Sequence, residues 1–98
     1  MKNIFDIEKP KGGEVFDSPL RHKNVKIERI VSSNKIGNKE FTPEQDEWVI
    51  LLNGRAKLDL GGNVHELREG DYLFIPAGQK HKVLETKSGT VWLVVHIF

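Results

Sequence analysis

The segment from Gly70 to His81 constrains the fold of this 98-residue chain more than any other part of it. Its first glycine opens a short apolar run, Tyr72–Ile75, a proline ends that run, and a second glycine allows another turn. A new strand is predicted to begin at His81 and to continue to Thr86. The pattern therefore holds one imidazole on a rigid strand just after a tight corner, where a small β-barrel can direct it into its mouth.

The rest of the chain also predicts strands joined by turns. Alternation of polar and apolar residues, β-branched runs and turn signals such as Asn53-Gly54 and Gly61-Gly62-Asn63 define them. The predicted strands are 24–31, 47–52, 56–60, 64–67, 72–75, 81–86 and 91–98. No stretch of a dozen residues carries the 3.6-residue period of a helix. Short strands at this spacing predict an all-β sandwich or barrel, with an OB-like barrel as one alternative.

Length predicts a single domain over residues 1–98, because a chain this short has no room for a second core. Residues 1–20 contain two prolines and two glycines and are predicted to form an extended arm with short strands, leaving 21–98 for the barrel. Apolar residues between 4 and 16 need burial, and a second copy of the chain could supply it. We therefore expect a homodimer.

Composition excludes several classes of function. The net charge is +1 with lysines and arginines scattered, which argues against a nucleic-acid partner. The absence of cysteine excludes disulfides, thiolate metal sites and cysteine nucleophiles. The N-terminus lacks the apolar core of a signal peptide, and the longest apolar runs are too short to span a bilayer, so no membrane partner and a cytoplasmic location are expected.

The spacing of the first segment is that of a known motif. Gly70, Pro76, Gly78 and His81 match Gly-x5-Pro-x-Gly-x2-His, the second signature motif of the cupin superfamily, and Glu85 stands where that motif ends in asparagine. Residues 47–54 match the Glu-x6-Gly half of the first cupin motif. The chain thus resembles a small single-domain cupin, and the resemblance implies a double-stranded β-helix, or jelly-roll, barrel.

The two histidines of the first motif are missing. They should fall at 40 and 42, or at 41 and 43, where the chain has Glu40, Phe41, Thr42 and Pro43. Most cupin enzymes hold a divalent metal with three histidines and a glutamate. The resemblance therefore implies a metal set reduced to His81 and Glu47, and an atypical or weak site for Zn, Ni, Mn or Fe.

Strand geometry places Glu47 on the same face as Val49 and Leu51, and Trp48 on the other. If that face lines the barrel, Glu47 is either a metal ligand beside His81 or an exposed carboxylate at the rim. His81 is either a metal ligand or general base, or a histidine that hydrogen-bonds across the core.

Three further residues are weaker candidates for the same site. His96 has apolar neighbours on both sides, so it is either a third ligand or a buried histidine bonded to a backbone group. Glu40 occupies the position of a motif histidine and is either a ligand or an exposed loop acid. Gln45 precedes Glu47 by two residues and so shares its face.

Two functions remain open from the sequence. One is a non-catalytic cupin that binds a small polar ligand through hydrogen bonds in the barrel. The other is a metal-dependent cupin enzyme of isomerase, lyase or dioxygenase type, acting on a sugar-like or organic-acid substrate. The number of ligands that converge on one point would distinguish them.

Overall fold

The computed structural model describes all 98 residues and contains strands but no helix. The strands are β1 (Glu14–His22), β2 (Val25–Ser32), β3 (Glu40–Phe41), β4 (Asp46–Asn53), β5 (Arg55–Leu60), β6 (Asn63–Arg68), β7 (Tyr72–Ile75), β8 (His81–Thr86) and β9 (Thr90–Ile97). The bounds of β7 and β8 are the predicted ones, because glycine and proline turns mark both ends of this corner.

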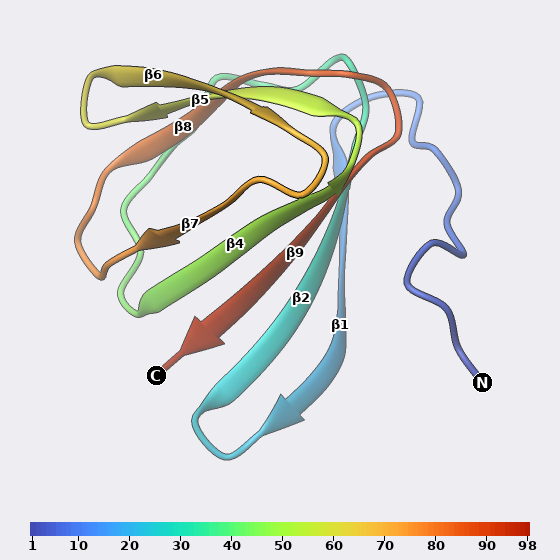
Figure 1. Cartoon of the computed structure of the whole chain (residues 1–98), viewed down its shortest axis with the longest axis horizontal. Helices are drawn as coiled ribbons and strands as arrows, with labels where there is room; N and C mark the ends of the chain where they lie inside the picture. The colour runs from blue at the N-terminus through green and yellow to red at the C-terminus, as the bar shows by residue number, and fades with distance from the viewer.

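The strands form two antiparallel sheets. One has the order β1-β2-β9-β4-β7, and the other has the order β3-β8-β5-β6. Figure 1 shows the first sheet as a fan from β7 to β1, with β5, β6 and β8 gathered over one end of it. Chain neighbours β4 and β5 lie in different sheets, whereas β9 pairs with both β2 and β4. This arrangement confirms the predicted jelly-roll barrel.

The two sheets enclose one apolar core. Alternate residues of β4 and of β9 from Trp92 onward point inward, so that Val49, Leu51, Trp92 and Val94 are buried. Leu58 on β5 faces them from the second sheet. The core fills one end of the barrel and leaves the other end to the polar residues that begin β4 and end β9.

The hairpin predicted at Gly61-Gly62 is confirmed, since Leu60 pairs with Asn63 across a two-residue turn. A second glycine turn needs its glycine for space as well as for backbone angle. Gly54 has φ of 102°, and a Cβ there would lie 2.4 Å from Thr90 Oγ1. The passage from β4 to β5 therefore depends on the absence of a side chain at Gly54.

The boundary between arm and barrel is Glu14 rather than residue 21. Residues 14–22 form the longest strand of the molecule, β1, which pairs with β2 at the sheet edge. Pro19 argues against a continuous strand when the sequence alone is considered. Proline is tolerated at sheet edges and bulges, however, and the β1–β2 register shifts between Asp17 and Leu20. The arm is therefore residues 1–13, and Arg29 holds it by donating to the backbone oxygens of Ile4 and Asp6 at 3.0 and 3.1 Å.

Candidate functional site

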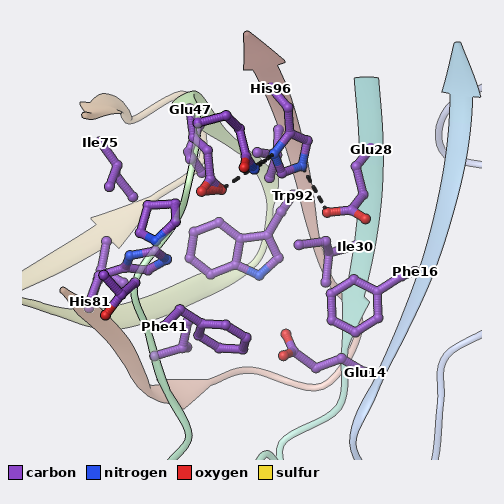
Figure 2. A pocket seen from close by; sticks show the side chains of 17 residues that line it. Glu14, Phe16, Glu28, Ile30, Phe41, Glu47, Ile75, His81, Trp92 and His96 are labelled. Atoms are coloured by element: carbon purple, nitrogen blue, oxygen red, sulfur yellow. Dashed lines mark hydrogen bonds and ion pairs between the residues drawn. The ribbon is translucent and has the colours of Figure 1, made fainter. Parts of the chain in front are cut away.

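A cavity of about 250 Å³ lies between the two sheets at the polar end of the barrel. All five strands of the larger sheet and strands β3, β5 and β8 of the other contribute side chains to it. In Figure 2 the Trp92 indole lies at the middle, with Glu47, His96 and Glu28 to one side and Phe41 and Glu14 among the residues on the other. The walls are mainly apolar, and the polar groups come from separate strands.

Glu47 is the buried carboxylate of this cavity. It is the second residue of β4, points inward with Val49, and is 9% exposed. Burial raises the pKa of Glu47, and nearby His96 and His81 oppose that rise only in part, while Glu28 adds to it. No hydrogen bond within the chain engages its carboxylate, although His96 Nδ1 lies 3.8 Å from its Oε1. Glu47 is therefore an acceptor with capacity to spare.

His96 is fixed by two side chains. Gln45 Nε2 lies 2.7 Å from His96 Nδ1, and His96 Nε2 lies 3.1 Å from Glu28 Oε1. Since a carboxylate only accepts, Nε2 carries the proton, and Nδ1 accepts from the Gln45 amide in the neutral ring. Both nitrogens are thus occupied within the protein. The expectation of a backbone partner for His96 is wrong, because two side chains satisfy the ring.

His81 begins β8 and lines the cavity from the second sheet. Its Nδ1 donates to the backbone oxygen of Gln79, two residues earlier, at 3.2 Å, and its ring stacks on Phe41 at 5.7 Å between centroids. In the neutral ring this leaves Nε2 unprotonated, and no group in the chain bonds to it. The corner therefore presents an open acceptor nitrogen, at a side chain that lines the cavity.

Trp92 is held by a second chain of hydrogen bonds. Its Nε1 donates to Ser32 Oγ at 3.1 Å, and the Ser32 hydroxyl donates to the carboxylate of Glu14 at 2.5 Å. Ser32 is fully buried, so this chain fixes the indole plane within the cavity. The indole is thus a rigid aromatic surface rather than a donor available to a ligand.

Comparison with known proteins decides the family. The sequence profile of the Cupin domain matches residues 31–96, which is most of the chain. The chain belongs to the cupin family. The matched region runs from the end of β2 to His96, and so contains most of the cavity-lining residues of this cupin.

Several solved structures share the fold. A protein from Ralstonia eutropha JMP134, described as a proposed mannose-6-phosphate isomerase, is 35% identical with a TM-score of 0.90, over 99% of this chain and 96% of that one. A cupin superfamily protein from Desulfitobacterium hafniense DCB-2 is 18% identical with a TM-score of 0.83, over 94% and 84%. KdgF from Halomonas sp. is 14% identical with a TM-score of 0.78, over 88% and 80%.

No curated protein sequence matches this cupin. None of its segments forms a helix with the length and apolar character of a membrane span.

The structure brings most of the sequence-predicted site residues together. Those that line the cavity are Gln45, Glu47, His81 and His96. Glu40 does not, because it lies exposed on β3, where it pairs with Lys82 at the sheet edge. Sequence reasoning missed Glu28, Glu14 and Trp92. The alternation of residues 24–31 held a signal for Glu28, but it indicated only that one face was polar and not that this face points inward.

The donor set of this cupin does not fit a resident divalent metal. No group of three histidine, aspartate or glutamate side chains is arranged to hold an ion. His96 already uses both ring nitrogens, and Glu40, which replaces a motif histidine, lies outside the cavity. His81 and Glu47 alone fall short of the three protein ligands that catalytic metal sites commonly use. The polar groups are arranged for hydrogen bonding instead.

Proposed function

We propose that this cupin binds a small organic ligand in the barrel cavity, through hydrogen bonds to Glu47 and His81 and without a resident metal. The observation that carries the proposal is a pair of open hydrogen-bonding groups that line the cavity from the two different sheets. Every fully buried side-chain nitrogen and oxygen has a partner, whereas the Glu47 carboxylate and His81 Nε2 have none. A ligand that bonds to both would complete the cavity.

Cavity size supports a small ligand. Pockets for drug-sized ligands are about 300–1,000 Å³, and this cavity is about 250 Å³. Its apolar walls, formed in part by Ile30, Val49 and Val94, would take the body of the ligand. The few polar groups would then fix the orientation of the ligand, as they commonly do in small-molecule sites with mainly apolar walls.

The two tryptophans allow a direct test. The Trp92 indole lies in the cavity, whereas Trp48 lies on the outer face against Tyr72 at 5.5 Å between ring centroids. A fragment library should therefore shift the indole N–H signal of Trp92 in NMR spectra, and leave that of Trp48 in place. The protein should be purified without a histidine tag and treated with a chelator, so that a shift cannot depend on a metal.

A matched pair of variants locates the binding. Ile30→Phe places a larger side chain in the cavity and should weaken the Trp92 shifts, whereas Ile50→Phe adds the same volume on the outer face of β4 and should retain them. Both isoleucines are partly buried, which keeps the folding cost of the two changes comparable. Fragments that shift Trp92 as strongly in Ile30→Phe as in the parent protein, or that shift none of the protein's signals, would refute the cavity as a binding site.

A metal-dependent enzyme is the second candidate. It is favoured by the 35% identity to the Ralstonia eutropha protein described as a proposed mannose-6-phosphate isomerase. On that hypothesis Glu47 and His81 would be the metal ligands, with His96 or Gln45 joining after rearrangement. We expect at most weak, substoichiometric binding of Zn, Ni, Mn or Fe, because the open donors are only two.

Metal analysis separates the two candidates. If an ion binds, His81→Ala should abolish binding, whereas His65→Ala, which changes an exposed histidine on β6, should not. A tight ion in one-to-one ratio, together with isomerisation of mannose 6-phosphate that stops on chelation, would favour the enzyme over the metal-free pocket.

We also propose that this cupin forms a homodimer through the outer face of the larger sheet. Tyr72 is 67% exposed and Phe74 is 56% exposed on the edge strand β7. Together they leave roughly 200 Å² of aromatic surface in water, about a quarter of the roughly 800 Å² that each partner buries in a standard dimer. Trp48, Ile50 and Ile97 extend the same face. Light scattering should give twice the 11.2 kDa chain mass, and Phe74→Lys should give the monomer.

A further inference from the structure

We propose that the cavity selects a small ammonium ion, that is, a protonated amine with an apolar body, over neutral and anionic ligands of the same shape. The inference rests on the proposed ligand-binding function and adds the charge of the ligand. Three independent features of the lining support it: its formal charge, the character of its open hydrogen-bonding groups, and its aromatic walls.

The charge of the lining is one-sided. Three carboxylates, Glu14, Glu28 and Glu47, line the cavity, and no lysine or arginine does. The nearest cation to them at the rim is Lys26, whose Nζ lies 3.7 Å from Glu28 Oε2 without entering the lining. A phosphate or carboxylate in this cavity would meet like charges and neither lysine nor arginine as a partner, which is costly in a desolvated site. Anionic ligands, sugar phosphates among them, are therefore disfavoured.

The two open groups that the proposed ligand would bind, the Glu47 carboxylate and His81 Nε2, are acceptors. The Glu47 carboxylate accepts hydrogen bonds when ionised. His81 Nε2 accepts in the neutral ring, because Nδ1 carries the ring proton and donates a hydrogen bond to the backbone oxygen of Gln79. A ligand that bonds to both must donate at least two hydrogen bonds. A primary ammonium group offers three donors together with a positive charge. Burial raises the pKa of Glu47, which indicates that the His96 and His81 rings compensate its charge only in part. A bound cation would compensate the remaining negative charge of the Glu47 carboxylate.

The aromatic side chains favour the same ligand. Trp92 and Phe16 line the cavity, and aromatic ring faces attract cations when water is excluded. The Phe41 ring also lines it but is already engaged, since it stacks on His81 and Lys39 Nζ lies 5.4 Å from its centroid. The remaining walls are aliphatic, which suits the apolar body of an amine. A dry apolar cavity of about 150 Å³ is enough to hold benzene, so a cavity of about 250 Å³ has room for a ring bearing an aminomethyl group.

A charge series on one ring tests the inference. Benzylamine, which is protonated at neutral pH, benzyl alcohol and benzoate share a ring and differ in charge by one unit at each step. Each would be titrated into the chelator-treated protein while the indole signals of Trp92 and Trp48 are followed. We expect benzylamine to bind about tenfold more tightly than benzyl alcohol, the difference that one desolvated cation–π or charge-assisted contact supplies. Benzoate should not shift Trp92.

Variants assign the selectivity to the carboxylates. Glu47→Gln and Glu28→Gln keep the size of each side chain and remove its charge. Each should reduce the preference for benzylamine over benzyl alcohol several-fold, through weaker binding of the amine alone. Glu66→Gln removes an exposed carboxylate on β6, outside the cavity, and should leave the preference unchanged.

The outcomes separate this inference from the proposed function. If benzyl alcohol or benzoate shifts Trp92 at concentrations equal to or lower than benzylamine, charge selection is wrong while the ligand pocket stands. A tenfold preference that survives in both Glu47→Gln and Glu28→Gln would also overturn it. If none of the three compounds shifts Trp92, or if all shift Trp48 equally, the pocket itself fails, and the inference fails with it.

Discussion

Replacing Glu47 by glutamine should stabilise this cupin more as the pH rises. Burial is the main cause that raises the pKa of Glu47 above its ordinary value of 4.5. A carboxyl whose pKa is raised on folding binds its proton more tightly in the folded chain, so ionisation opposes folding. The resulting loss of stability is absent below the unfolded pKa, grows through the interval between the two pKa values, and is complete above the folded one. Glutamine at position 47 cannot ionise and escapes this loss.

The size of the effect follows from proton linkage. Within that interval the stability of the parent protein, relative to Glu47→Gln, should fall with pH by up to about 1.4 kcal/mol per pH unit, since at most one proton is involved. For a domain of this length, each kcal/mol corresponds to about 4–8 °C in Tm. Glu47 is only 9% exposed, so solvent screens little of this penalty. The difference between the two proteins should then level off at higher pH.

Thermal unfolding of the two proteins between pH 4 and pH 8, followed by circular dichroism, measures the difference directly. Groups common to both cancel in the comparison, which leaves position 47. Glu66→Gln is the control, because its carboxylate is exposed and its loss should not reproduce the widening. A difference in Tm that stays constant with pH, or that narrows as pH rises, would show that Glu47 is not held in a desolvated site and would refute the reasoning.

Two structural predictions concern the turn and the indole that frame the cavity. Gly54→Ala places a Cβ 2.4 Å from Thr90 Oγ1 at φ of 102°, whereas the control Gly62→Ala has a similar φ of 98° and no atom within 4 Å of the added Cβ. Chemical denaturation should show that Gly54→Ala lowers the free energy of unfolding by about 1–3 kcal/mol more than Gly62→Ala does. Equal losses in the two variants would contradict the contact with Thr90. Trp92→Phe loses the hydrogen bond to Ser32 and should lower the free energy of unfolding by about 1–3 kcal/mol. A double-mutant cycle with Ser32→Ala should show a coupling energy of about 1 kcal/mol, and additive losses would exclude the bond.

The parts of the fold that the sequence predicts are those with local causes. The corner from Gly70 to His81 carries its own turn residues, and Gly61-Gly62 closes a hairpin between neighbours in the chain. The inward direction of Glu47 follows from its shared face with Val49 and Leu51. The edge strand β1 had no such signal, because most of its residues are exposed and its register shifts beside Pro19.

The rest of the site could not be predicted because it depends on which way a strand faces. In β2 the residues Val25 and Ile27 alternate with Lys26 and Glu28, a pattern that ordinarily directs the apolar residues inward. The structure has the opposite orientation, since Glu28 and Ile30 line the cavity. Alternation gives the period of a strand but not its direction, and the direction of β2 is decided by its pairing with β9.

That pairing sets Glu28 opposite Val94 and brings its side chain within hydrogen-bonding distance of His96, 68 positions away in the chain. No local signal relates two residues so far apart, and both stand where the barrel is left unfilled rather than where the core is packed. At this end of the barrel the usual arrangement, with apolar side chains inside and polar ones outside, is reversed. The polar Glu28, Glu47 and His96 point inward, whereas the apolar Trp48 and Ile97 face outward. An inverted pattern of this kind is the expected mark of a polar cavity under an apolar outer face. The arrangement of alternating residues at this end of the barrel therefore supports both the ligand site and the dimer surface proposed for this cupin.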